Sequence, residues 1–304
     1  MAGKNNILQI PNIADYYAIC GMGKPKHPLI GIYTFEELPA MNIPDDVKFT
    51  LGYYVVTIKY NDTCGSQYGQ TKYDYDEGIM GFTAPHQVLG VNKDFKPPEK
   101  GWSLMFHPDF LLGYALAQKI HHFHFFDYAI NEALILSEDE DRDINDLFLK
   151  IRQEINRPID NFSQDVLISQ LDLLLTFSNR YYNRQFIIRK PLNNHLVTKF
   201  EQLLENYFSD ENAQRELPTV AYFADQLHLS GKYFSDVLKQ LTGKTAQQHI
   251  HDKVIEKAKK YLSTTSLSVA EIAYHLGFDY PQSFSKLFKT KTKQTPQAFR
   301  ISFN

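Results

Sequence analysis

The first half of the chain alternates short runs of β-branched and aromatic residues with turn residues. These runs lie at Leu29–Tyr33, Val47–Tyr60, Gly78–Val91 and Trp102–Phe106. Short strands separated by turns are typical of antiparallel sandwiches and small barrels. The pattern therefore predicts a β-sandwich or small barrel between Leu29 and about His107.

After Pro108 the hydrophobic spacing changes to that of helices, at Asp143–Ile155 and Ser163–Tyr182. The second helix has a wide apolar stripe, formed by Leu167, Leu171, Leu173, Leu174, Leu175 and Tyr181. Two interpretations stay open. The stripe packs on the sheet of its own domain, or it also supplies the seam of a dimer, because so wide a stripe serves two surfaces.

The last 85 residues contain an internal repeat. Val220–Leu227 aligns with Val269–Leu276 at an offset of 49, and Phe234–Lys239 aligns with Phe284–Lys289 at an offset of 50. Apolar or small residues coincide at each core position. The chain therefore holds two copies of one supersecondary unit, at about 219–241 and 268–291.

Each copy has the pattern of a helix-turn-helix: a short helix, a tight turn and a second amphipathic helix. Thr219 and Ser268 are expected to cap the first helices, and Ser230 and Asp279 the second. Capping boxes are expected at Ser268 with Glu271 and at Thr245 with Gln248. In the turns, Gly277 suits a positive φ, whereas the first copy has His228 and is expected to be slightly strained.

A connecting helix is expected between the copies, from about Ala246 to Leu262. Its apolar positions recur every four residues, at Ile250, Val254, Ala258 and Leu262. A last short helix begins at Thr295–Pro296, where a capping residue precedes a proline at the first helical position.

Charge is unevenly distributed along the chain. The net charge of the 304 residues is −3. The part from Val220 onward contains 12 Lys and Arg and 6 Asp and Glu, which gives it a net charge of +6. A basic C-terminal part suits a polyanionic partner. A 43% hydrophobic fraction suffices for an ordinary core. The apolar runs are too short for a membrane span, and no secretory signal is evident. Two cysteines are too few for a disulfide framework. A cytoplasmic protein is therefore expected.

The stretch from about Leu196 to Phe303 resembles the DNA-binding domain of the AraC/XylS family of bacterial transcription regulators. The residues that carry the resemblance are Leu229–Ser230, Phe234–Gly243, Ile272–Asp279, Phe284–Lys289 and Thr295–Arg300. Less specifically, Gly101–Pro108 resembles the end of the cupin-like sensor domain of such regulators. The resemblance implies an α+β chain: a cupin-like sensory and dimerisation domain at 1–190 and an all-α DNA-binding domain at 191–304.

In such a domain the second helix of each copy enters the major groove and presents its exposed side chains to bases and phosphates. The expected DNA-binding residues are Lys232, Tyr233, Ser235, Asp236, Lys239, Gln282, Ser283, Ser285, Lys286 and Lys289. Gln282 is suited to adenine and Lys286 to guanine. Asp236 is an acid, which accepts only from a cytosine amino group and repels phosphate.

Other candidate sites are weaker. His121, His122, His124 and Asp127 could be metal ligands, but their aromatic neighbours favour packing. Cys64 lacks an adjacent base to activate its thiol. His86 and Trp102 could line a pocket, although packing explains them as well.

The sequence therefore predicts a regulator that binds double-stranded DNA sequence-specifically, without catalytic residues, metal or cofactor. A small-molecule effector, a homodimer and RNA polymerase are its expected partners. Two alternatives stay open: a cupin-type metal-dependent enzyme or metal sensor at residues 29–130, and an architectural DNA binder without sequence preference.

Overall fold

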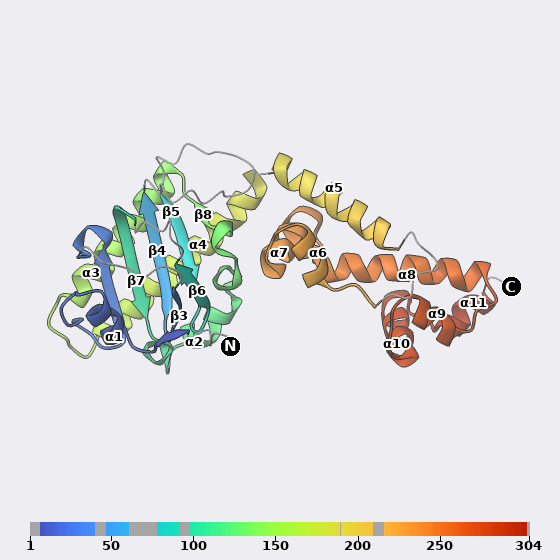
Figure 1. The fold of residues 1–304 in the computed structure, drawn as a ribbon, viewed down its shortest axis with the longest axis horizontal. Coiled ribbons are helices and arrows are strands. Elements are labelled where there is room, and N and C mark those ends of the chain that lie inside the picture. The colour runs from blue at the N-terminus through green and yellow to red at the C-terminus, as the bar shows by residue number, and fades with distance from the viewer. Residues whose placement is uncertain are drawn as a thin grey trace, which may run out of the picture. The chain divides into compact units, whose positions relative to one another are not determined.

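The fold comes from a computed structural model, which describes residues 7–39, 47–60, 78–91, 98–188, 190–208 and 216–302. The chain divides into two compact units, Met1–Gln185 and Phe186–Asn304. The first contains the strands and the second is helical (Figure 1).

Within its described residues, the first unit holds two β-sheets. The strands are β1 (Leu8–Ile10), β2 (Ile30–Thr34), β3 (Val47–Leu51), β4 (Tyr54–Tyr60), β5 (Ile79–Thr83), β6 (Val88–Val91), β7 (Lys100–Phe106) and β8 (Leu134–Ile135). One sheet has the order β1-β3-β6 and the other β2-β7-β4-β5-β8. A hydrophobic cluster draws on both sheets, with Leu51 of β3 in one and Tyr33 and Met105 of β2 and β7 in the other. The predicted β-rich half is thus present as two sheets sharing a core.

Between Leu29 and His107, where the pattern is typical of an antiparallel sandwich or small barrel, the strand pairs of the described residues are antiparallel. A parallel pair is formed with a strand outside this range, at the edge of the smaller sheet. β1 pairs with β3 in parallel, with Leu8 opposite Phe49 and Ile10 opposite Leu51. The three residues of β1 are too few for the alternation that marks a strand in a sequence. All other strand pairs are antiparallel within the described part of the chain.

The first unit also contains four α-helices within its described residues. They are α1 (Ile13–Ile19), α2 (Leu116–Lys119), α3 (Glu138–Ile155) and α4 (Ser163–Ile188), which continues to the start of the second unit. The indole Nε1 of Trp102 on β7 donates to Asn145 Oδ1 of α3 at 3.0 Å. Tyr182 of α4 packs on Phe82 of β5, with ring centroids 6.0 Å apart. These contacts explain Trp102 as a packing residue.

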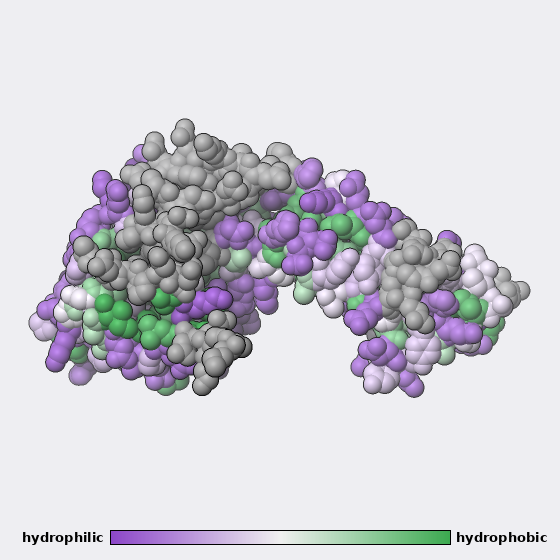
Figure 2. Space-filling model, viewed as in Figure 1, coloured by the Kyte–Doolittle hydropathy of each residue, from purple (hydrophilic) through white to green (hydrophobic). Residues whose placement is uncertain are grey.

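The second unit consists of helices in its described residues. They are α5 (Lys190–Tyr207), α6 (Val220–Gln226), α7 (Gly231–Thr242), α8 (Ala246–Thr264), α9 (Val269–His275), α10 (Pro281–Thr292) and α11 (Pro296–Ile301). One hydrophobic cluster joins them, with the fully buried Phe200, Phe234, Val254, Ile272 and Phe284 among its members. Figure 2 shows mainly hydrophilic residues over the visible face of this unit, with small separate hydrophobic areas.

Candidate nucleic-acid interface

The first helix-turn-helix is formed by α6, α7 and the turn between them. The Thr219 side chain accepts the Tyr222 N–H at 3.1 Å, and the Ser230 side chain accepts the Tyr233 N–H at 3.2 Å. In the turn, the Leu229 N–H donates to the Ala224 carbonyl at 2.9 Å. Both predicted caps of this copy are confirmed, and they fix where each helix begins.

The second copy repeats this geometry with α9 and α10. Its turn closes through the equivalent bond, from the Phe278 N–H to the Ala273 carbonyl at 3.0 Å. Ser268 and Glu271 form the predicted capping box, and the bonds from the Ser268 backbone and side chain lower the pKa of the Glu271 carboxyl. The predicted cap at Asp279 is wrong. Pro281 is the first residue of α10, so the capping position falls on Tyr280.

Each copy has a residue in the left-handed region at two equivalent positions. The first position holds His228 (φ 57°) and Gly277 (φ 88°). The second, which ends α7 or α10, holds Gly243 (φ 75°) and Lys293 (φ 66°). A side chain at positive φ costs about 1 kcal/mol relative to glycine. The strain expected at His228 therefore has a counterpart at Lys293.

Gly277 is required for a second reason. The Leu217 N–H donates to the Gly277 carbonyl at 2.9 Å, so the chain preceding α6 passes directly over the second turn. A Cβ at Gly277 would lie 2.4 Å from the Leu217 nitrogen and 2.5 Å from the Glu216 carbonyl carbon. This glycine therefore lets the segment before the first copy pack against the second copy.

The predicted connecting helix is α8, with the capping box of Thr245 and Gln248 at its start. Asp252 on its surface links the two copies. One of its carboxylate oxygens accepts from Lys244 Nζ at 2.7 Å and the other from Lys291 Nζ of α10 at 2.8 Å. Partial burial opposes the ionised carboxylate, but the bonds from the two lysines prevail and lower the pKa of Asp252.

Most of the predicted DNA-contacting residues lie at the surface of α7 and α10. The exposed ones are Lys232, Lys239, Gln282, Ser283, Lys286 and Lys289, and the half-buried ones are Ser235, Asp236 and Ser285. Tyr233 does not face outward: its side chain is 7% exposed and its ring packs edge-on against Phe186 at 5.3 Å. Tyr233 shares a helix face with the buried Val237, one turn further along, so its outward assignment is wrong.

The serines of the two copies are not equivalent. Ser235 Oγ accepts the Ala246 N–H at the start of α8, at 3.3 Å. The residue at the same place in the second copy is Pro296, which has no N–H to donate. Ser235 thus fixes the following helix, whereas Ser285 has no such bond among the described residues.

Tyr280 is a candidate that the sequence analysis missed. It precedes the first turn of α10, and its side chain is 68% exposed. An aromatic residue so exposed, beside Gln282 and Ser283, offers a flat apolar face and a hydroxyl at the end of the helix expected to approach DNA. The sequence signal was its place directly before the proline that begins the helix.

The alternative sites find little support in the geometry. Among the described residues no group of three or more His, Cys, Asp and Glu side chains is placed to hold a metal ion. His121, His122 and Asp127 are exposed and His124 is half-buried. Cys20 is buried, which raises the pKa of its thiol, and Cys64 lies outside the described residues. His86 lies exposed in a turn at positive φ. Across the described ranges, no helix is both long and apolar enough to cross a membrane.

Comparison with known proteins agrees with this geometry. A family profile described as "Helix-turn-helix domain" matches residues 223–302. An uncharacterized HTH-type transcriptional regulator of Pseudoalteromonas carrageenovora is 35% identical over 114 residues, which cover 37% of this chain and 63% of that protein. The HTH-type transcriptional activator RhaS of Escherichia coli O157:H7 is 33% identical over 138 residues, 45% of each chain.

One solved structure is that of the C-terminal domain of the response regulator yesN from Fusobacterium nucleatum, which is 29% identical in sequence. The match covers 35% of this chain and 98% of the yesN domain, with a TM-score of 0.31. The chain spans less than two thirds of the two curated relatives. Both curated relatives are named as transcription regulators. The C-terminal unit therefore carries an AraC-type helix-turn-helix domain.

Proposed function

We propose that this protein is a transcription regulator that binds double-stranded DNA sequence-specifically through its C-terminal unit. The observation that carries the proposal is the presence of two helix-turn-helix copies joined by α8, each with a side-chain cap on its first helix and the same turn bond. Two recognition helices on one chain read two groove segments. The activity of the transcription regulators it resembles supports the same conclusion.

In this proposal α7 and α10 enter successive segments of the major groove. Lys232, Gln282, Ser283 and Lys286 belong to the exposed early part of these helices and are assigned to base edges, with Asp236 and Ser285 half-buried beside them. Lys239 and Lys289, further along, are assigned to phosphates. The 19 residues of α8 extend about 28 Å, close to the ~34 Å between groove segments on one face of DNA.

The first unit is proposed to be a cupin-like sensory and dimerisation domain. Its two sheets and shared core support the β-rich, cupin-like architecture. On α4, Leu171 and Leu174 are fully buried while Val166 and Leu173 stay 38% and 45% exposed, which supports a second apolar surface for a homodimer.

RNA polymerase is the further proposed partner. The proposed activity needs no catalytic residue, and it places the protein in the cytoplasm with the DNA it controls.

Footprinting on the DNA that flanks its own gene tests the proposal. We expect two protected segments about one helical turn apart, and protection that survives a large excess of random duplex. Equal affinity for operator and random duplex would instead identify an architectural binder. Stoichiometric metal bound at His122 and His124, together with no retention of any duplex, would support the metal-dependent alternative.

A further inference from the structure

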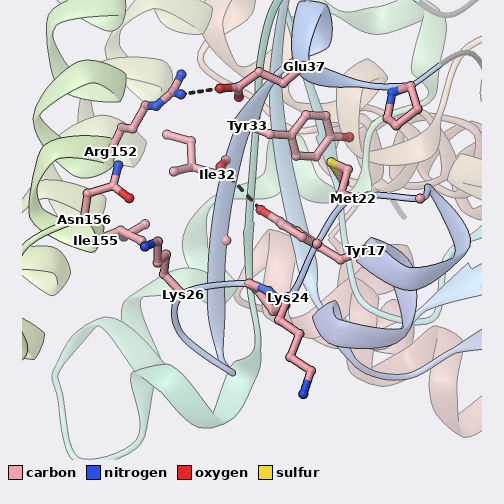
Figure 3. A pocket seen from close by; sticks show the side chains of 15 residues that line it. Tyr17, Met22, Lys24, Lys26, Ile32, Tyr33, Glu37, Arg152, Ile155 and Asn156 are labelled. Carbon is pink, nitrogen blue, oxygen red and sulfur yellow. Dashed lines mark hydrogen bonds and ion pairs between the residues drawn. The ribbon is translucent and has the colours of Figure 1, made fainter.

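The first unit contains a pocket of about 420 Å³ at the edge of β2. Its walls come from α1, the segment that connects α1 to β2, β2 itself and the C-terminal end of α3. Figure 3 shows Tyr17, Met22 and Tyr33 on one side and Arg152, Ile155 and Asn156 on the other. A volume of this size falls within the range of small-molecule sites.

The charged residues that line the pocket are mostly basic. Lys24, Lys26 and Arg152 contribute three positive charges against the single negative charge of Glu37. Arg152 forms an ion pair with Glu37, whereas neither lysine has an ion pair within the described ranges. Figure 3 shows Lys26 extending toward Ile155 and Asn156, while Lys24 points away from the other labelled side chains. Lys26 is therefore the cation, in addition to Arg152, that a ligand in the pocket can contact.

Arg152 is held in a fixed orientation. Its guanidinium forms an ion pair with Glu37 and lies 5.4 Å from the centre of the Trp102 ring. A guanidinium has five N–H donors in a planar fork, so one ion pair leaves donors for a second acceptor. The planar fork matches a carboxylate better than it matches a spherical anion.

The opposite wall is apolar and neutral. Met22 contributes apolar surface, and the Tyr17 hydroxyl donates to the Ile32 carbonyl at 3.3 Å. Burial, followed by the charges of Tyr33 and Glu37, raises the pKa of Tyr17 to about 12, so this hydroxyl stays neutral at physiological pH. A ligand here meets cations at one end and apolar side chains at the other.

We propose that this pocket binds a small organic acid, with its carboxylate at the side that holds Lys26 and Arg152 and its apolar body against Met22 and Tyr17. The carboxylate competes with Glu37 for the Arg152 guanidinium. Binding therefore loosens a contact between the segment after β2 and α3. The inference rests on the first unit alone and does not depend on DNA binding by the second.

Titration of the full chain by ligand-observed NMR tests the site, with cyclohexanecarboxylate as the probe. The neutral cyclohexanecarboxamide has the same shape without the charge, and inorganic phosphate has charge without an apolar body. We expect the carboxylate to bind with a dissociation constant on the order of 1 mM, typical of so small a ligand, and at least fivefold tighter than either comparison compound. Equal binding of the carboxylate and the amide, or no binding of the carboxylate, would overturn the proposal.

Two lysines of one segment provide a matched pair of variants. Lys26→Gln should weaken binding of the carboxylate at least fivefold, whereas Lys24→Gln, the same change on a side chain that points away, should alter it less than twofold. Glu37→Gln removes the competing carboxylate and should tighten binding severalfold. Equal losses in both lysine variants, or weaker binding in Glu37→Gln, would show that the anion is held by general surface charge and not by this pocket.

Discussion

At the scale of single residues, the two helix-turn-helix copies adopt the left-handed backbone conformation at equivalent positions but place different residues there. Each needs the left-handed conformation in its turn and at the end of its second helix, and each has glycine at only one of the two places. His228 and Lys293 occupy the strained alternatives, while Gly277 also makes room for Leu217. Local stability is therefore limited at one position per copy.

The first prediction concerns the turn of the first copy. His228→Gly removes the Cβ from a residue at φ 57° and should raise the free energy of unfolding by about 0.5–1 kcal/mol, since the turn conformation is kept without strain. Chemical denaturation followed by far-ultraviolet circular dichroism measures the change.

The control lies at the equivalent place in the second copy. Gly277→Ala should lower the free energy of unfolding by at least 1–3 kcal/mol, because it adds strain at positive φ and pushes the new methyl group against the Glu216–Leu217 backbone. If the histidine variant were less stable than the natural protein, strain at His228 would not be what limits this turn.

The second prediction separates base recognition from phosphate binding on α10. Lys286→Ala should cost about 1–3 kcal/mol of binding and relax the preference at one base pair. Lys289→Ala, one lysine further along the same exposed side, should weaken binding to all sequences alike and lower the salt slope by about one ion. Competition with operators mutated at single positions distinguishes the two effects. A uniform loss for Lys286→Ala would assign this lysine to a phosphate.

At the scale of elements, the sequence predicted the helical unit well because its signals are local. The capping boxes of α8 and α9, the serine cap of α7 and the left-handed Gly277 each depend on residues within one turn, and all are confirmed. Tyr233 and Asp279 were misassigned for the opposite reason. The first is buried by a distant residue, Phe186, and the second loses its capping role to the proline that follows.

Elements that depend on distant partners were harder to predict. The parallel pairing of β1 with β3 joins residues about 40 positions apart, and no pattern within β1 signals it. The pocket in the first unit is lined by both Lys26 and Arg152, which lie far apart in the sequence and belong to no common motif. The Asp252 bridge likewise includes Lys291, which follows it by 39 positions in the sequence.

The third prediction concerns this bridge between elements. Because the two lysines lower the pKa of Asp252 below its unfolded value of 3.8, the bridge should contribute stability above about pH 5 and lose it as the pH falls through 3.8 and the lower folded value. Asp252→Asn should thus melt at a lower temperature than the natural protein at pH 6, and the difference should shrink at pH 3. Thermal melts at both pH values, followed by circular dichroism, measure it. A difference that does not change with pH would mean that the carboxylate charge does not stabilise the fold.

At the scale of the whole molecule, the division into two units predicts that the C-terminal one folds alone. The division places Phe186 with the second unit. There its ring packs on Tyr233, and its carbonyl accepts from Asn193 Nδ2 at 2.9 Å. A fragment should therefore begin at Phe186 and not at Leu192, where the charge and the repeat alone would place its start.

The fourth prediction compares these two fragments with the full chain. The fragment from Phe186 should bind operator DNA, and it should bind more weakly than the full chain, because the proposed homodimer would link two copies and raise the effective concentration of the second. The fragment from Leu192 leaves Tyr233 without its ring partner and should unfold about 1–3 kcal/mol more easily, since Tyr233 lies at the start of α7 and a large part of its burial is lost. Mobility-shift titrations and chemical denaturation of both fragments provide the measurements. If the Phe186 fragment bound DNA as tightly as the full chain, the first unit would add no second copy to the complex. If the folded Phe186 fragment bound no DNA, the helical unit would not be the DNA-binding domain.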